Sequence, residues 1–308
     1  MFDLIRFQRS WLLLRSSLRV MVRSPKLLLF PAATFACVAS MVLFYFALAV
    51  LLPSGHRLNE PAHWQAVAAR WGHLQKTGPH TQQWQPNGAA YLYLVAAYLA
   101  TMVGATFFNV AFYHEILEAL AGERVSLRTG LAFAARRIRP ILLWSLLAGA
   151  VGLLICTLER RSGFVGRIIL RSIGMLWNVA SIFVIPVMIR ETDADPIRLL
   201  KTSAAILRKT WGEALIGYVG IAFGAWIVLV SSVVAAVGLV ALSFWTHHLA
   251  LMLTAGIGWL LAVVVLVYVV EVANDIYCCA LYIYASEGVV PAPYNADLMD
   301  AAWRVRKP

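Results

Sequence analysis

Residues 27–52 read LLLFPAATFACVASMVLFYFALAVLL, an apolar run without a single Asp, Glu, Lys or Arg. A helix of about 20 residues crosses the roughly 30 Å hydrocarbon core of a bilayer, so this run is long enough to span a membrane. A surface helix of a soluble protein would carry a polar stripe along its length, and this run does not. It therefore predicts a transmembrane helix.

The composition extends this prediction to the whole chain. Of the 308 residues, 61% are hydrophobic and 13% are charged, whereas a soluble domain is about half apolar and a quarter charged. We therefore predict an all-α membrane protein of about six transmembrane helices. The further spans are expected near 89–117, 141–158, 168–189, 213–242 and 250–285. The last pattern exceeds one bilayer thickness at about 1.5 Å per residue, so its inner end should project into the cytoplasm.

The distribution of positive charge predicts the orientation. With both termini inside, the inner segments hold 19 of the 26 Lys and Arg residues, as expected for cytoplasmic loops. We therefore expect a multi-pass protein of the bacterial inner membrane with both termini cytoplasmic. One outer turn fits poorly, because it carries Arg160, Arg161, Arg167 and Arg171. These can pair with Glu159, bind outer phosphates, or indicate that the turn dips inward.

Residues 1–26 form the first predicted region, a basic amphipathic helix at the interface. Its apolar residues recur every three or four positions, as on one helix face. Five arginines occupy the rest of the circumference and are the candidate lipid-headgroup ligands: Arg6, Arg9, Arg15, Arg19 and Arg23. The helix can lie on the membrane, pack against the protein's own cytoplasmic face, or do both. The net charge of +11 is attributed to lipid contact, because no nucleic-acid motif is present.

The remaining regions are a six-span membrane domain over 27–285, with an outer loop at 53–88, and a cytoplasmic tail over 286–308. Within the loop, Ala62 to Leu74 is predicted to form a short interfacial helix. Six histidines fall outside the membrane and favour a solvated loop over a metal or pH-sensing site, because their spacing is irregular. They are His56, His63, His73, His80, His247 and His248. The four cysteines lack CxxC spacing and are interpreted as small buried hydrophobes.

A structural unit recurs three times, near Ser17, Gly130 and Ser203: a basic cytoplasmic helix followed by two spans. This pattern predicts three hairpins around a common centre, as internal repeats do in many transport proteins. The alternative is that any basic helix before a span gives the same pattern. Gly220 and Gly224 have GxxxG spacing, a weak indication of close helix packing.

Polar residues gather near the inner ends of the second, fourth and sixth predicted spans. They form the candidate polar cavity: Asn109, Glu115, Asn178, Glu191, Glu271, Asn274 and Asp275. Ionisable groups in a membrane are costly and usually face protein or water, so they could line a cytoplasm-facing cavity or ion path. Alternatively, the carboxylates pair with the basic cytoplasmic helices. No nucleophile, metal-ligand set or cofactor motif indicates an enzyme. The expected partners are membrane lipids, and other membrane proteins or a second copy are further possibilities.

Several segments together resemble a bacterial family of multi-pass membrane proteins of unknown function. They are Phe7–Trp11, Leu28–Pro31, Leu158–Arg167, Val184–Val187, Ser203–Glu213 and Leu281–Ala285. More loosely, the plan of basic helix and hairpin is similar to the membrane domain attached to some glycerophosphodiester phosphodiesterases, whose catalytic barrel is absent here. The resemblance implies a topology but no activity. Two roles stay open: a permease or channel-like protein for a small solute or lipid, and a non-catalytic scaffold or accessory subunit.

Overall fold

The computed structural model describes residues 2–76, 82–191, 195–209, 229–230, 232–234, 236–238, 241 and 249–294. Most of the predicted fifth span, with Gly220 and Gly224, lies outside these residues. The helices are α1 (Phe2–Arg23), the 3-10 helix η1 (Pro25–Leu28), α2 (Leu29–Leu51), α3 (Pro61–Trp71), α4 (Gly88–Leu120), α5 (Leu127–Arg136), α6 (Ile138–Arg161), α7 (Phe164–Ala180), α8 (Val184–Arg190), α9 (Pro196–Lys209) and α11 (Leu249–Glu287). The strands are β1 (Gly72–Lys76) and β2 (Gln82–Pro86).

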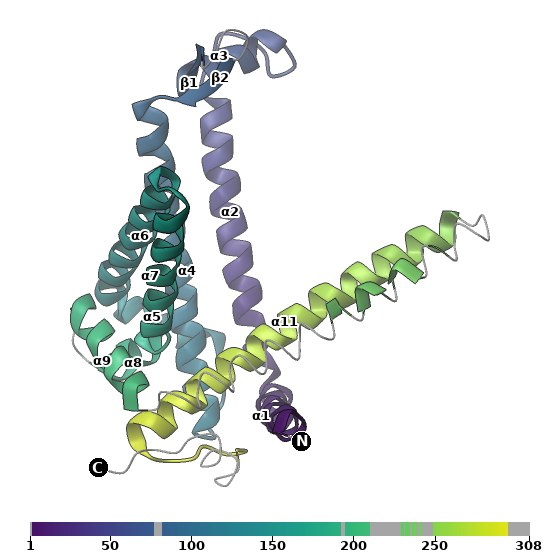
Figure 1. The fold of residues 1–308 in the computed structure, drawn as a ribbon, viewed down its shortest axis with the longest axis vertical. Coiled ribbons are helices and arrows are strands. Elements are labelled where there is room, and N and C mark those ends of the chain that lie inside the picture. The colour runs from purple at the N-terminus through teal and green to yellow at the C-terminus, as the bar shows by residue number, and fades with distance from the viewer. Residues whose placement is uncertain are drawn as a thin grey trace.

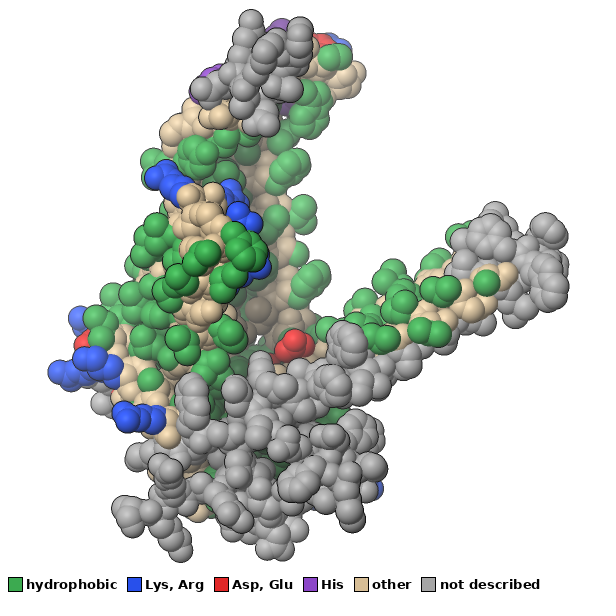
Figure 2. Space-filling view, in the orientation of Figure 1, with side chains coloured by type: hydrophobic (Ala, Val, Ile, Leu, Met, Phe, Trp, Pro, Cys, Tyr) green, Lys and Arg blue, Asp and Glu red, His purple; other side chains and the backbone are tan. Residues whose placement is uncertain are grey.

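Five segments of the described chain are long and apolar enough to cross a membrane. They are Pro25–Leu51, Gly88–Leu120, Ile138–Arg161, Phe164–Arg190 and Gly256–Glu287. Their side chains face outward over much of their length, and apolar side chains cover the bundle surface (Figure 2). The prediction of an all-α membrane protein is therefore confirmed. The count of six spans and their arrangement as three hairpins stay predictions.

The bundle has two distinct ends (Figure 1). α2 and α4 run side by side, α6 packs on α4, and α7 packs on α6. α3, β1 and β2 lie at one end, while α1 and the C-terminal end of α11 lie at the other. From that second end α11 extends away from α2 and α4 (Figure 1). The second end is called the basic end below, because α1, α5 and α9 place their arginines there.

The buried core also lies at the basic end. It collects side chains of α4, α6, α8 and the C-terminal part of α11 around residues that are fully enclosed, such as Phe30, Ile116 and Tyr277. Along α11 burial is continuous from Val272 to Tyr284, apart from the partly exposed Asn274 and Asp275. At this end, the described helices therefore bury their side chains against one another.

The loop after α2 differs from its prediction. The helix expected over Ala62 to Leu74 ends at Trp71, and β1 pairs antiparallel with β2, placing Leu74 opposite Trp84. The Trp71 indole Nε1 donates to the Ala49 carbonyl at 3.3 Å, which fixes the loop on the end of α2. The prediction missed the two strands because their residues show no period-two alternation of apolar and polar side chains.

The fourth predicted span corresponds to Phe164–Arg190, which is long and apolar enough to cross a membrane, but it is not one continuous helix. It divides into α7 and α8 at residues 181–183. Proline has no backbone N–H, so Pro186 cannot donate to the Ile182 carbonyl one turn earlier. That carbonyl lies 3.8 Å from the Cys278 thiol of α11 instead.

A serine of α9 completes the break between α7 and α8. The Ser203 hydroxyl donates to the Ala180 carbonyl at 2.6 Å and accepts from the Phe183 N–H at 3.1 Å. Non-helical backbone within a membrane protein needs such partners, because lipid supplies none. Ser203 is itself fully buried. Its hydroxyl therefore satisfies the backbone groups left free at the break and connects α9 to the segment between α7 and α8.

The N-terminal helix packs on the protein itself. Leu13, Ser17 and Val20 of α1 are buried, mainly through contacts with α11, and the Ser17 hydroxyl lies 2.8 Å from the Tyr294 hydroxyl. Burial raises the pKa of Tyr294 well above its usual value. This face therefore packs on the protein itself, which was one of the two alternatives. The exposed arginines of the opposite face, Arg15, Arg19 and Arg23, still predict headgroup contact.

Candidate functional site

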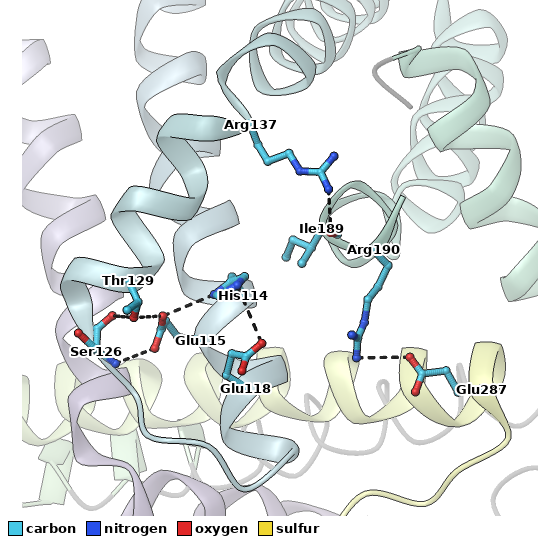
Figure 3. Close-up of polar contacts among 9 residues, drawn as sticks. All are labelled: His114, Glu115, Glu118, Ser126, Thr129, Arg137, Ile189, Arg190 and Glu287. Atoms are coloured by element: carbon cyan, nitrogen blue, oxygen red, sulfur yellow. Dashed lines mark hydrogen bonds and ion pairs between the residues drawn. The ribbon is translucent and has the colours of Figure 1, made fainter. Parts of the chain in front are cut away.

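Glu115 is the centre of a polar cluster at the basic end of α4 (Figure 3). Its side chain is 1% exposed. One carboxylate oxygen accepts from the Ser126 backbone N–H at 2.7 Å, and the other accepts from the Thr129 hydroxyl at 2.6 Å. A buried carboxylate is tolerated only when such bonds replace its water. Glu115 therefore fixes the first turn of α5 against α4.

The surrounding packing holds this cluster tightly. His114 Nδ1 lies 3.5 Å from a Glu115 oxygen, and its ring stacks on Phe133 of α5 with centroids 4.0 Å apart. A Cβ on Gly130 would come within 2.9 Å of the Ala111 carbonyl oxygen and of the Glu115 side chain. The close approach of α5 to α4 thus requires a glycine at position 130.

Two arginines extend the network to α8 and α11 (Figure 3). Arg137 donates to the backbone carbonyl of Glu191 at 2.7 Å and to that of Ile189 at 3.4 Å, which caps the end of α8. Cations near a helix C-terminus are favourable because the last carbonyls lack partners there. Arg190 forms an ion pair with Glu287 at 3.3 Å. The arginines therefore hold helices together at the basic end.

A second polar group lies on α11, where the helix leaves the core. The Tyr113 hydroxyl of α4 donates to an Asp275 carboxylate oxygen at 2.7 Å. One turn earlier on α11, Glu271 is exposed. The Asn274 side-chain oxygen is buried and has no hydrogen-bond partner in the described part of the chain. These residues mark the transition between the buried and exposed parts of α11.

The seven candidate cavity residues thus occupy different environments. Glu115 is enclosed and fully bonded, Asp275 is bonded to Tyr113, and the Glu191 carbonyl binds Arg137. Asn178 is exposed on α7, and Asn109 is partly buried on α4. The structure brings Glu271, Asn274 and Asp275 together on α11 but gives Glu115 separate partners.

Sequence reasoning missed the partners rather than the carboxylates. Neither Thr129 nor Tyr113 was singled out from the sequence, and Ser203 was named only as the start of a repeat unit. A signal existed for α5, since Ser126 stands immediately before a helical pattern, as an N-cap residue does. No local signal indicates that Tyr113 meets a residue 162 positions later.

Two histidines of the loop over residues 53–88 have structural neighbours. His63 is buried, and its Nδ1 lies 2.6 Å from the Ser54 hydroxyl. His56 lies 3.6 Å from Glu60. His80, His247 and His248 lie outside the described residues. In the part of the chain that is described, no three His, Cys, Asp or Glu side chains gather as metal ligands would.

The fold and this network define a multi-pass α-helical membrane protein whose helices are joined by buried polar contacts at one end. Residues 88–291 match a family described as a family of unknown function, DUF6159. This is more than half of the chain, and the protein belongs to that family. The match starts at α4, so the N-terminal segments that contributed to the resemblance lie outside it. No curated protein and no solved structure matches the chain.

Proposed function

We propose that the protein is a non-catalytic membrane scaffold that presents its apolar helix faces to other membrane components. One observation carries this proposal: at the basic end, two of the buried or partly buried carboxylates that could have lined a passage are bonded within the fold. Glu115 is occupied by Ser126 and Thr129, and Asp275 by Tyr113. At the same time, Ile257, Leu260 and Val264 of α11 are more than half exposed.

The topology of the proposal keeps six spans in three hairpins, each preceded by a basic helix, with both termini in the cytoplasm of a bacterial cell. The bias of Lys and Arg toward the inner segments supports this orientation. So does the position of α1 and the C-terminal end of α11 at one end of the bundle (Figure 1). The proposal keeps the three predicted regions, which are the interfacial helix over 1–26, the membrane domain over 27–285 and the cytoplasmic tail over 286–308. The internal repeat and the looser similarity to phosphodiesterase membrane domains belong to this proposal as well.

Labelling of intact cells tests the orientation. A cysteine at His73, in the outer loop, should react with a membrane-impermeant maleimide, and one at Arg128, in α5, should react only after the membrane is opened. The four native cysteines are first replaced with alanine to remove background. The reverse pattern of labelling would invert the topology.

A specific observation favours a second candidate, a permease or channel-like protein for a small solute or lipid. Glu271 is exposed one turn beyond an apolar stretch, and the buried Asn274 oxygen nearby has no described partner. A carboxylate facing lipid is costly, so its surroundings should be wet or occupied. The break between α7 and α8 adds to this view, since transporters often use discontinuous helices.

Cysteine accessibility separates the two functions. In the cysteine-free background, single cysteines replace Glu271, Val264 and Glu287, and opened membranes are treated with an impermeant maleimide. A scaffold predicts that only the Glu287→Cys variant reacts, because lipid or a partner covers the other two positions. A permease predicts that Glu271→Cys reacts as fast as Glu287→Cys while Val264→Cys stays protected. The latter result would replace the scaffold with an aqueous pathway.

A further inference from the structure

A pocket of about 580 Å³ lies at the basic end, apart from the Glu115 cluster. Three parts of the chain line it: the junction of α1 with η1, the loop between α4 and α5, and the C-terminal segment at Ala292. Its volume falls within the range of small-molecule sites in proteins. The first candidate span begins at Pro25, so the pocket lies where that helix starts.

The lining of this pocket is strongly basic. Arg23 and Lys26 come from the α1–η1 junction, and Arg124 comes from the α4–α5 loop almost a hundred residues later. Among the described lining residues, Glu123 is the one carboxylate. Within the described residues, none of the three cations forms an ion pair. Among the described residues, the fold thus brings three positive charges and one carboxylate around one hollow.

The backbone that carries these three side chains is anchored on both sides of the pocket. α4 ends in a Schellman motif, in which Gly122 has a φ of 88° and the Glu123 N–H donates to the Glu118 carbonyl at 2.9 Å. Val125 is buried immediately after Arg124, and Leu27 immediately after Lys26. The cations therefore project from anchored backbone, and binding an anion would cost little ordering of the chain.

The chemistry of the lining selects the ligand class. A guanidinium donates two parallel N–H groups to the oxygens of a phosphate, and a lysine adds a compact charge beside it. We propose that this pocket binds the phosphate group of an anionic ligand through Arg23, Lys26 and Arg124. The phosphate can belong to an anionic lipid headgroup at the membrane surface or to a free phosphate compound in the cytoplasm.

Native mass spectrometry of the full-length protein in nonionic detergent tests this proposal. The protein is titrated with phosphatidylglycerol, phosphatidylcholine and inorganic phosphate. The pocket variant R23Q/K26Q/R124Q is compared with R128Q/R136Q/K201Q, which loses the same charge from exposed positions outside the pocket. Since each basic residue near an anionic surface contributes about fivefold, the pocket variant should lose roughly tenfold or more in affinity. The control variant should change less than about twofold.

The three titrants distinguish the sources of phosphate. Binding of phosphatidylglycerol that is lost in the pocket variant and not displaced by millimolar inorganic phosphate identifies a lipid headgroup. Binding of inorganic phosphate that is lost in the same variant, without preference between the two lipids, identifies a free phosphate compound. Equal losses in the pocket and control variants, or no loss in either, would overturn the proposal.

A gain in affinity protects the experiment from misfolding of the triple variant. Glu123→Gln removes the one carboxylate from the lining and should strengthen binding of the same probe by about threefold, because a like charge no longer opposes the anion. A folding defect cannot produce such a gain. If Glu123→Gln leaves the affinity unchanged in a protein with the wild-type thermal midpoint, the pocket does not hold the phosphate.

Discussion

The two parts of α11 have similar apolar content but different surroundings. In the N-terminal part, Ile257 is 59% exposed and Val264 is 57% exposed, whereas Ile276 and Ala280 in the C-terminal part are 0% exposed. The first part extends away from the bundle, and the second enters the core at the basic end (Figure 1). Hydropathy alone therefore identifies a membrane helix without showing which surface meets lipid and which meets protein.

The two parts of α11 differ in where their polar residues lie. The buried part contains Ala273, Cys279 and Ala280 together with Asn274 and Asp275. Its exposed counterpart is rich in Leu, Val and Ile. In membranes lipid tails are as apolar as leucine, so helices associate through close packing of small residues and through polar contacts. In α11 the exposed part also holds Gly256 and Gly258 and the buried part holds the large Tyr277, so polar residues, rather than small ones, mark the packed part.

A matched pair of isoleucines on this one helix gives the largest expected effect. Ile276→Ala should lower the free energy of unfolding by about 3 kcal/mol, because a buried branched side chain is lost and a cavity remains. Ile257→Ala should change it by less than about 0.5 kcal/mol, because its neighbour is lipid or detergent. Unfolding by sodium dodecyl sulfate from mixed micelles, followed by circular dichroism, measures both. Similar losses in the two variants would mean that the exposed part is packed as well.

The spans were predictable from sequence because bilayer thickness fixes their length. Residues 89–117 were expected to span and α4 covers Gly88–Leu120, while 141–158 corresponds to α6 at Ile138–Arg161. Apolar runs and the basic residues that flank them carry this information locally. The ends differ by only a few residues, since helices continue beyond the hydrocarbon into the interface.

The joints between helices could not be predicted in the same way. The break after Ala180 was hidden in an apolar run, although Pro186 was a visible reason to expect one. The bond between Glu115 and Thr129 depends on α5 folding back onto α4. Likewise, the basic pocket depends on Arg124 meeting Arg23 across the fold. Such contacts arise from tertiary packing, and no periodicity in the sequence records them.

Removing the Ser203 hydrogen bonds at the break between α7 and α8 should have an intermediate effect on stability. This change extends the comparison from α11 to the rest of the basic end. Ser203→Ala should cost about 2 kcal/mol, because the Ala180 carbonyl and the Phe183 N–H lose their buried partner. The matched control is Ser172→Ala on α7, whose exposed hydroxyl donates to the Ile168 carbonyl of its own helix. This control should change stability by less than about 0.5 kcal/mol in the same titration. Equal changes in the stability of the two variants would show that lipid or water can bind the Ala180 carbonyl and the Phe183 N–H in place of Ser203.

The smallest expected effect concerns the polar contact at which α11 enters the core. Tyr113→Phe removes the donor to Asp275 and should cost about 1 kcal/mol, the usual net value of one such bond. Tyr91→Phe, an exposed position at the other end of α4, serves as the control and should be neutral. A double-mutant cycle with Asp275→Asn should give a coupling of about the same size. If the coupling is zero while Ile276→Ala is costly, packing alone holds α11 in the core, and Asp275 is free to serve a ligand.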